Sequence, residues 1–273
     1  MNKAIFSDPK LGSTQITFTA FHLFTTWITL HIVSMRRFAV FERRTAGLLE
    51  ILPLAVSSAA NVIVLNTSLQ FCSVPFYQTV RVLLTPVTAL LNYLIYTKTI
   101  PRQAAFMLIP ICAGAATMSY FDVKPGADKT KAAETSTFGA CFALAGVFVS
   151  SIYTVWMQHY HKKLEMSSPQ LLHQLSLVGG VLLLYIIPFV DTLPRASEVS
   201  ASNWALLALS GVCAVLINLS QFTIVSDAGA VAGTVVGHAK TILIVTLGWM
   251  MSGKSVSGSS FLGCVIAILG VVL

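Results

Sequence analysis

The sequence predicts an all-α, polytopic membrane protein, and three observations lead to this fold class. First, 55% of the 273 residues are hydrophobic and only 10% are charged, whereas soluble domains carry roughly 25% charged residues. Second, the mean hydropathy is +0.79. Third, apolar segments follow one another at the length of about 20 residues that a helix needs to cross a bilayer. Because one water-soluble core cannot bury so many apolar residues, the bilayer must be the solvent.

Nine segments reach or approach the spanning length and leave no room for a soluble domain. The predicted spans are 15–35, 48–71, 74–97, 103–121, 138–158, 169–190, 204–225, 229–251 and 258–273. We therefore expect a single transmembrane transporter domain over 1–273. Its first half is predicted at 1–121 and its second half at 138–273.

The connectors between these spans alternate in charge. Those after the first, third and fifth spans carry net charges of +3, +2 and +1, and those after the fourth and sixth carry 0 and −1. The positive-inside rule places the first set in the cytoplasm. The overall net charge of +7 is thus a topology signal, and we expect no nucleic-acid partner.

Two other classes of function find little support in the residues. The five cysteines are scattered singly without a CxxC pair, so no metal site is predicted, and no cofactor is expected. An enzyme should show His, Asp or Glu clusters at the membrane interface, and none is convincing. A scaffold function would not explain why charged residues lie at membrane depth.

An internal repeat indicates two halves of opposite orientation. When 74–121 is laid on the last two spans at an offset of 156, Lys98 falls on Lys254 and Thr85 on Thr241. Five spans separate the copies, which is the inverted-repeat architecture of secondary transporters. With five helices in each half the protein has ten, so we expect this copy to lack most of the first helix, which leaves its activity open.

Two ionisable residues lie deep in the predicted spans. Arg81 is eight residues into its span and Lys240 is twelve residues into its own, about 12 Å and about 18 Å along the helix. Each costs roughly 2.5 to 3.5 kcal/mol on insertion scales. Because no intramembrane Asp or Glu is available to pair with them, the two side chains either hydrogen-bond to backbone carbonyls and water or bind an anion in a cavity. A guanidinium and an ammonium together favour phosphate.

Several polar neighbours share these helices. Tyr77 and Gln78 lie on the face of Arg81 at helical spacing, and Pro86 one turn later is expected to break the helix. His238 is a candidate second wall of the site, and Asn218 in the preceding span is a candidate sugar or base contact. Hydrogen bonding between helices is the alternative role for all four polar side chains.

A glycine stripe precedes Lys240. Gly229, Gly233 and Gly237 recur every four residues, which predicts a close helix crossing at that position.

These residues carry a resemblance to the triose-phosphate translocator and nucleotide-sugar transporter family of the drug/metabolite transporter superfamily. The matching stretches are Asn66-Thr67-Ser68-Leu69, Ser73-Val74-Pro75-Phe76-Tyr77-Gln78-Thr79-Val80-Arg81, Thr85-Pro86 and Gly237-His238-Ala239-Lys240-Thr241. The resemblance implies ten helices, cytosolic termini and exchange of substrate against phosphate or a nucleoside monophosphate. It also implies phosphate binding by Lys240 and by Arg81, where the family more often has lysine.

The resemblance is closer to the nucleotide-sugar carriers. Plastid triose-phosphate carriers have Lys-Arg where this chain has Lys240-Thr241, and a histidine in place of Gln78. We therefore expect an antiporter that exchanges a nucleotide-sugar for a nucleoside monophosphate. A sugar-phosphate/phosphate antiporter is the alternative. The candidate substrate-binding residues are Lys240, Arg81, Tyr77, Gln78, Thr241, His238 and Asn218.

The expected partners are the phosphorylated substrate, its counter-substrate and the lipid bilayer. The resemblance implies a multi-pass protein of the Golgi, with the endoplasmic reticulum as the alternative. The sugar, the base, the counter-substrate and the oligomeric state, a homodimer included, stay open.

Overall fold

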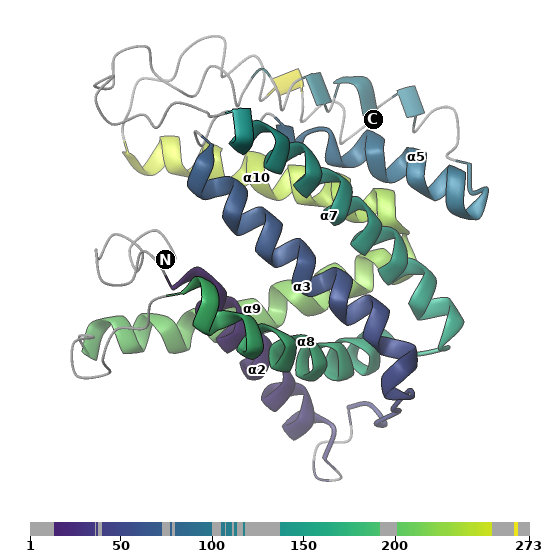
Figure 1. The fold of residues 1–273 in the computed structure, drawn as a ribbon, viewed down its shortest axis with the longest axis vertical. Coiled ribbons are helices and arrows are strands. Elements are labelled where there is room, and N and C mark those ends of the chain that lie inside the picture. Colours follow the sequence, from purple (N-terminus) through teal and green to yellow (C-terminus); the bar gives the residue numbers. More distant parts are fainter. Residues whose placement is uncertain are drawn as a thin grey trace. The chain divides into compact units, whose positions relative to one another are not determined.

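Seven helices form the regular structure of the residues that a computed structural model describes (Figure 1). These residues are 14–35, 37, 40–72, 77, 80–99, 105–106, 108–110, 112–113, 117, 137–191, 201–252 and 265–266, with only backbone at 69–70, 201–203, 241–242 and 244–252. The helices are α2 (Gln15–Val33), α3 (Leu48–Phe71), α5 (Leu84–Tyr96), α7 (Thr137–Lys163), α8 (Ser168–Val190), α9 (Ala201–Asp227) and α10 (Ala230–Ser252). These ranges contain no strand, which confirms the predicted all-α class.

The helices agree with the predicted spans in six cases. α2, α3, α7, α8, α9 and α10 each begin within three residues of the predicted start. Five helices in the described ranges are long and apolar enough to cross a membrane, at 15–33, 48–68, 137–163, 168–190 and 204–227. The predicted spans at 103–121 and 258–273 lie mostly outside the described residues. The chain is a polytopic membrane protein.

The chain divides into two compact units, and each is built from two separate segments. Unit 1 comprises Met1–Ile63 and Trp156–Asp227, and unit 2 comprises Val64–Val155 and Ala228–Leu273. Unit 1 therefore takes one segment from each of the predicted halves, 1–121 and 138–273, whereas the segment Val64–Val155 of unit 2 extends across both halves.

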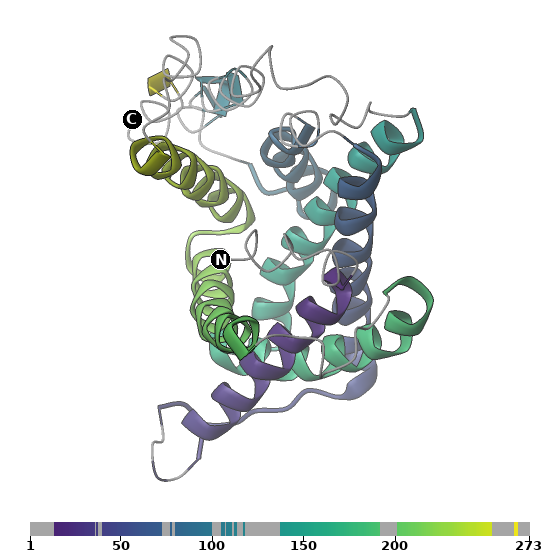
Figure 2. The same ribbon diagram turned by 90° about the vertical axis from the view of Figure 1, so that its left-hand side faces the viewer.

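Unit 1 is organised around α2. This helix packs against both α8 and α9, which also contact each other (Figure 2). At the end of α8 the Asp191 carboxylate accepts hydrogen bonds from the Thr17 backbone N–H at 2.6 Å and from its hydroxyl at 2.7 Å. The buried apolar core of unit 1 includes Ile16, Ala20, Ala59, Leu183 and Ile187.

Glycines allow α2 and α8 to approach closely. A Cβ added to Gly179 would lie 3.6 Å from Cδ1 of Leu23, and one added to Gly180 would lie 3.1 Å from Cζ of Phe24. Both pairs are 156 residues apart (179 − 23 and 180 − 24), which is the offset of the predicted repeat.

Unit 2 is built around the contact between α5 and α10. Leu91 of α5, Val155 of α7 and Ala230 of α10 share one buried cluster, so the three helices are packed together. α10 starts directly after Gly229, whose φ of 95° is a backbone conformation that glycine adopts without strain. This packing fixes α10, which carries His238 and Lys240, against α5, which begins three residues after Arg81.

Candidate functional site

The helix that carries Arg81 is interrupted just after this residue. Residues 80 and 81 are helical, 82 and 83 form a turn, and α5 begins at Leu84. Pro86 has no N–H to donate to the carbonyl of Val82 four residues earlier. The Cys112 thiol lies 3.7 Å from that carbonyl oxygen and is its hydrogen-bond donor. The predicted break at Pro86 is therefore confirmed, and it shortens the continuous helix that we expected over 74–97.

Tyr77 supports the Arg81 side chain from one turn below. The Arg81 Nη1 atom lies 3.5 Å from the Tyr77 hydroxyl, at the limit of a hydrogen bond, and its Cζ lies 5.7 Å from the ring centroid, within cation–π range. The ring is 5% exposed and packs in a cluster with Val80 and Val147. Because the ring is fixed by packing, it restricts where the guanidinium can lie.

His238 joins α10 to α5. Its Nε2 lies 2.9 Å from the Thr85 hydroxyl, across 153 residues of sequence. Thr85 is fully buried and follows Arg81 by one helical turn, whereas Lys240 follows His238 by two residues. The hydrogen bond therefore joins the two helices next to both cations.

Arg81 and Lys240 lie near each other in unit 2. Both residues flank the hydrogen bond between His238 and Thr85, and the Lys240 side chain is exposed rather than packed. The described residues of unit 2 contain no Asp or Glu, so neither cation has a carboxylate partner there. Two like charges held together without a counter-ion attract an anion.

The other predicted site residues have different outcomes. Gln78 and the Thr241 side chain lie outside the described residues, so their roles stay predictions. Asn218 belongs to unit 1, where its Nδ2 lies 3.4 Å from the Thr26 hydroxyl. Asn218 thus forms a hydrogen bond between helices, which was the alternative to its predicted role in contacting the sugar or base.

The structure adds one residue to the predicted set. An added Cβ at Gly237 would meet no described atom within 4 Å, and the close crossing at the glycine stripe stays a prediction. Thr85 was not among the predicted site residues. Its spacing of four residues from Arg81 within the predicted span 74–97 was the signal that could have identified it.

The described residues contain no group of three His, Cys, Asp or Glu side chains that could hold a metal ion.

Comparison with known proteins places the chain in a family. UDP-xylose transporter 2 of Arabidopsis thaliana is 28% identical over 100% of this chain and 75% of its own length. UDP-rhamnose/UDP-galactose transporter 2 of the same plant is 25% identical over 100% of this chain and 76% of its own length. One solved crystal structure has a TM-score of 0.75 at 13% identity, covering 98% of this chain and 91% of the other, which shows a shared fold. Since the model of the Triose-phosphate Transporter family matches residues 1–273, the chain belongs to that family.

Proposed function

We propose that this protein is an antiporter that exchanges a nucleotide-sugar for a nucleoside monophosphate, with Arg81 and Lys240 binding the phosphate groups. The observation that carries the proposal is the pair of cations in unit 2, which has no carboxylate partner among the described residues. Phosphate is common to both exchanged molecules. One site can therefore serve both directions of transport.

Exchange follows from the electrostatics of the empty site. When no anion is bound, Arg81 and Lys240 repel each other, and this repulsion is strong where water is scarce. A bound phosphate removes the repulsion and adds charge-assisted hydrogen bonds. The loaded carrier then reorients more easily than the empty one, so net uptake without a counter-substrate is slow.

The substrate class is inferred from the relatives and from the site. The relatives named above are transporters of UDP-xylose and of UDP-rhamnose/UDP-galactose, and a more distant one is named a GDP-mannose transporter. The pair Lys240-Thr241 supplies one cation where plastid triose-phosphate carriers have two. The family's description as triose-phosphate transporters keeps a sugar-phosphate/phosphate antiporter as the second candidate.

The proposed location is the Golgi membrane, where nucleotide-sugars made in the cytosol are consumed. Fluorescence microscopy of the tagged full chain beside Golgi and endoplasmic-reticulum markers tests this. Signal confined to the endoplasmic reticulum would reject the Golgi assignment.

Exchange in proteoliposomes tests the function. Vesicles that contain the full chain are preloaded with UMP, GMP or phosphate, and uptake of radiolabelled nucleotide-sugars and sugar phosphates is measured. We expect uptake of a nucleotide-sugar only against the matching monophosphate. Uptake that needs preloaded phosphate and a labelled sugar phosphate would support the second candidate instead.

Variants of the cations complete the test. Lys240→Ala and Arg81→Gln should abolish exchange, because each removes half of the positive charge of the site. Lys98→Ala is the matched control, since Lys98 follows α5 and lies over the Tyr96 ring at 5.6 Å, and it should leave exchange intact. Normal exchange by Lys240→Ala would refute the phosphate site.

A further inference from the structure

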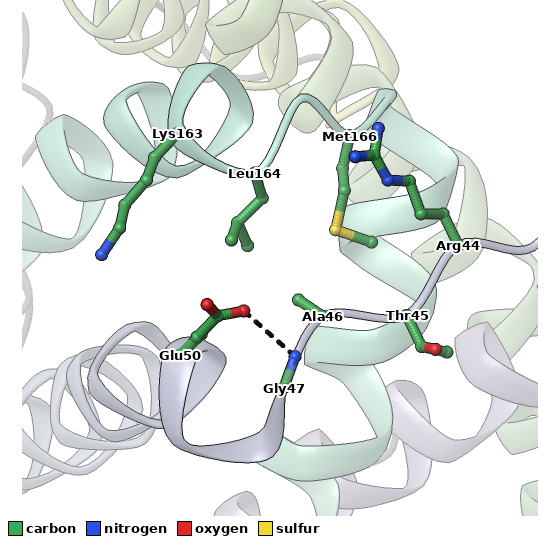
Figure 3. A pocket seen from close by; sticks show the side chains of 8 residues that line it. All are labelled: Arg44, Thr45, Ala46, Gly47, Glu50, Lys163, Leu164 and Met166. Carbon is green, nitrogen blue, oxygen red and sulfur yellow. Dashed lines mark hydrogen bonds between the residues drawn. The ribbon is translucent and has the colours of Figure 1, made fainter.

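A polar pocket of about 270 Å³ lies in unit 1 where the connector after α2 meets the start of α3 and the end of α7 (Figure 3). Its charged lining residues are Arg44, Glu50 and Lys163, and all three are exposed. Because α3 and α7 are both membrane spans, the pocket lies at the level of the lipid headgroups. The positive-inside rule places it in the cytoplasmic leaflet.

The three charged side chains are available to a ligand. Glu50 is oriented by Gly47, whose backbone N–H donates to the carboxylate at 3.1 Å. The Lys163 ammonium lies 5.3 Å from the centroid of the Tyr160 ring and forms no ion pair with a carboxylate in the described part of the chain. Figure 3 shows Lys163 and Glu50 extending into the same space from α7 and α3.

Arg44 forms the opposite side of the pocket. It donates a hydrogen bond to the Glu165 carbonyl at 2.9 Å, which orients the guanidinium. Its pairing with the Glu165 carboxylate is weak, because the atoms are 4.0 Å apart and the side chains are 55% and 81% exposed. A guanidinium has five N–H donors, so others remain for a ligand.

Lys163 and Glu50 lie on one side of the pocket, and Arg44 lies on the other side beside Met166 (Figure 3). We propose that the pocket binds the headgroup of phosphatidylserine, with Lys163 on the phosphate, Glu50 on the ammonium and Arg44 on the serine carboxylate. The lining holds two cations and one carboxylate, which match the two anionic groups and the ammonium of the headgroup. The volume holds about nine waters, enough for an amino-acid phosphodiester.

The surface beside the pocket suits the acyl chains of the same lipid. Leu48 and Leu49 directly follow Gly47, and they are 62% and 83% exposed. Phosphatidylserine is an anionic lipid of the cytoplasmic leaflet. Phosphatidylglycerol lacks the ammonium that Glu50 would bind, and phosphatidylethanolamine lacks the carboxylate that Arg44 would bind. A free nucleotide has no chains to cover the leucines.

Native mass spectrometry of the purified full chain, titrated with each of the three lipids, tests the proposal. We expect phosphatidylserine to bind about tenfold more tightly than phosphatidylglycerol, which corresponds to one charge-assisted hydrogen bond. Glu50→Gln keeps an acceptor for the Gly47 N–H but loses the negative charge. This variant should therefore bind the two anionic lipids equally.

Two lysine variants separate the pocket from general attraction to a basic surface. Lys163→Gln should weaken phosphatidylserine and phosphatidylglycerol alike by about tenfold, because both lipids carry the phosphate that Lys163 binds. Lys162→Gln makes the same charge change at the adjacent exposed residue outside the pocket, so it should weaken both lipids alike, by about fivefold at most. Absence of a preference in the native protein, a preference that survives Glu50→Gln, or displacement of the lipid by UMP would each overturn the proposal.

Discussion

The hydrogen bond between His238 and Thr85 makes a sharp prediction because α5 provides its own control. Thr85 and Thr88 are both fully buried threonines one turn apart in this helix. The Thr85 hydroxyl lies 2.9 Å from His238 Nε2, whereas the Thr88 hydroxyl has no hydrogen-bond partner in the described part of the chain. Replacing either residue with valine keeps the shape and removes the hydroxyl. Only the Thr85 substitution should therefore lower the stability.

The magnitude follows from what each hydroxyl does. Thr85→Val removes one hydrogen bond and leaves the partly buried His238 nitrogen unpaired, which costs about 1 to 2 kcal/mol. Thr88→Val removes a buried unpaired polar group, so its free energy of unfolding should be unchanged or higher by about 1 kcal/mol. At about 2 to 4 °C per kcal/mol, Thr85→Val should lower the Tm by about 2 to 8 °C.

The assay is thermal unfolding of the purified protein in detergent, followed by exchange in proteoliposomes. A double-mutant cycle of Thr85→Val with His238→Leu should recover a coupling energy of about 1 kcal/mol. Thr85→Val should also slow exchange, because the bond holds α10 beside Arg81. Equal losses of Tm in Thr85→Val and Thr88→Val, or an unchanged Tm in Thr85→Val, would refute the assignment.

Two further predictions concern unit 1. Gly180→Ala should lower the Tm, because its Cβ would lie 3.1 Å from the Phe24 ring and force the ring aside. Gly179→Ala has its nearest atom at 3.6 Å, so it should raise the Tm slightly, because alanine has a higher helix propensity than glycine by about 1 kcal/mol. The reverse order of the two Tm values would contradict the packing described. Asp191→Ala should reduce the free energy of unfolding by about 1.5 to 3 kcal/mol, as it removes both hydrogen bonds to Thr17. Chemical denaturation measures this change, and a loss below about 0.5 kcal/mol would show that water replaces the carboxylate.

The length and position of the spans could be predicted because lipid exposure leaves a long apolar signal in the sequence. The start of α5 at Leu84 could not, since Pro86 indicates a break without fixing which preceding residues form the turn. The partners of His238 and Asn218 are 153 and 192 residues away. A helical pattern in the sequence shows which residues lie on the same face of a helix. It carries no information on which distant helix covers that face. Arg81 and Lys240 could be singled out from the sequence, because burying an unpaired charge at membrane depth costs free energy whichever helix covers it.

The repeat offset gains a physical meaning from the contacts. A residue can touch its own repeat equivalent only where both lie at the axis that relates the two copies. Leu23 meets Gly179 and Phe24 meets Gly180 at the offset of 156, so α2 and α8 cross at such an axis in unit 1.

In unit 2 the corresponding pair is α5 and α10, which also pack together. Arg81 precedes α5 in the first half and Lys240 lies in α10 of the second, so the two cations come from different copies of the repeat. On the proposed function, a phosphate held by both would join the halves inside one compact unit. Either cation alone would hold the anion without coupling the halves, and Lys240→Ala should therefore abolish exchange more completely than it weakens binding.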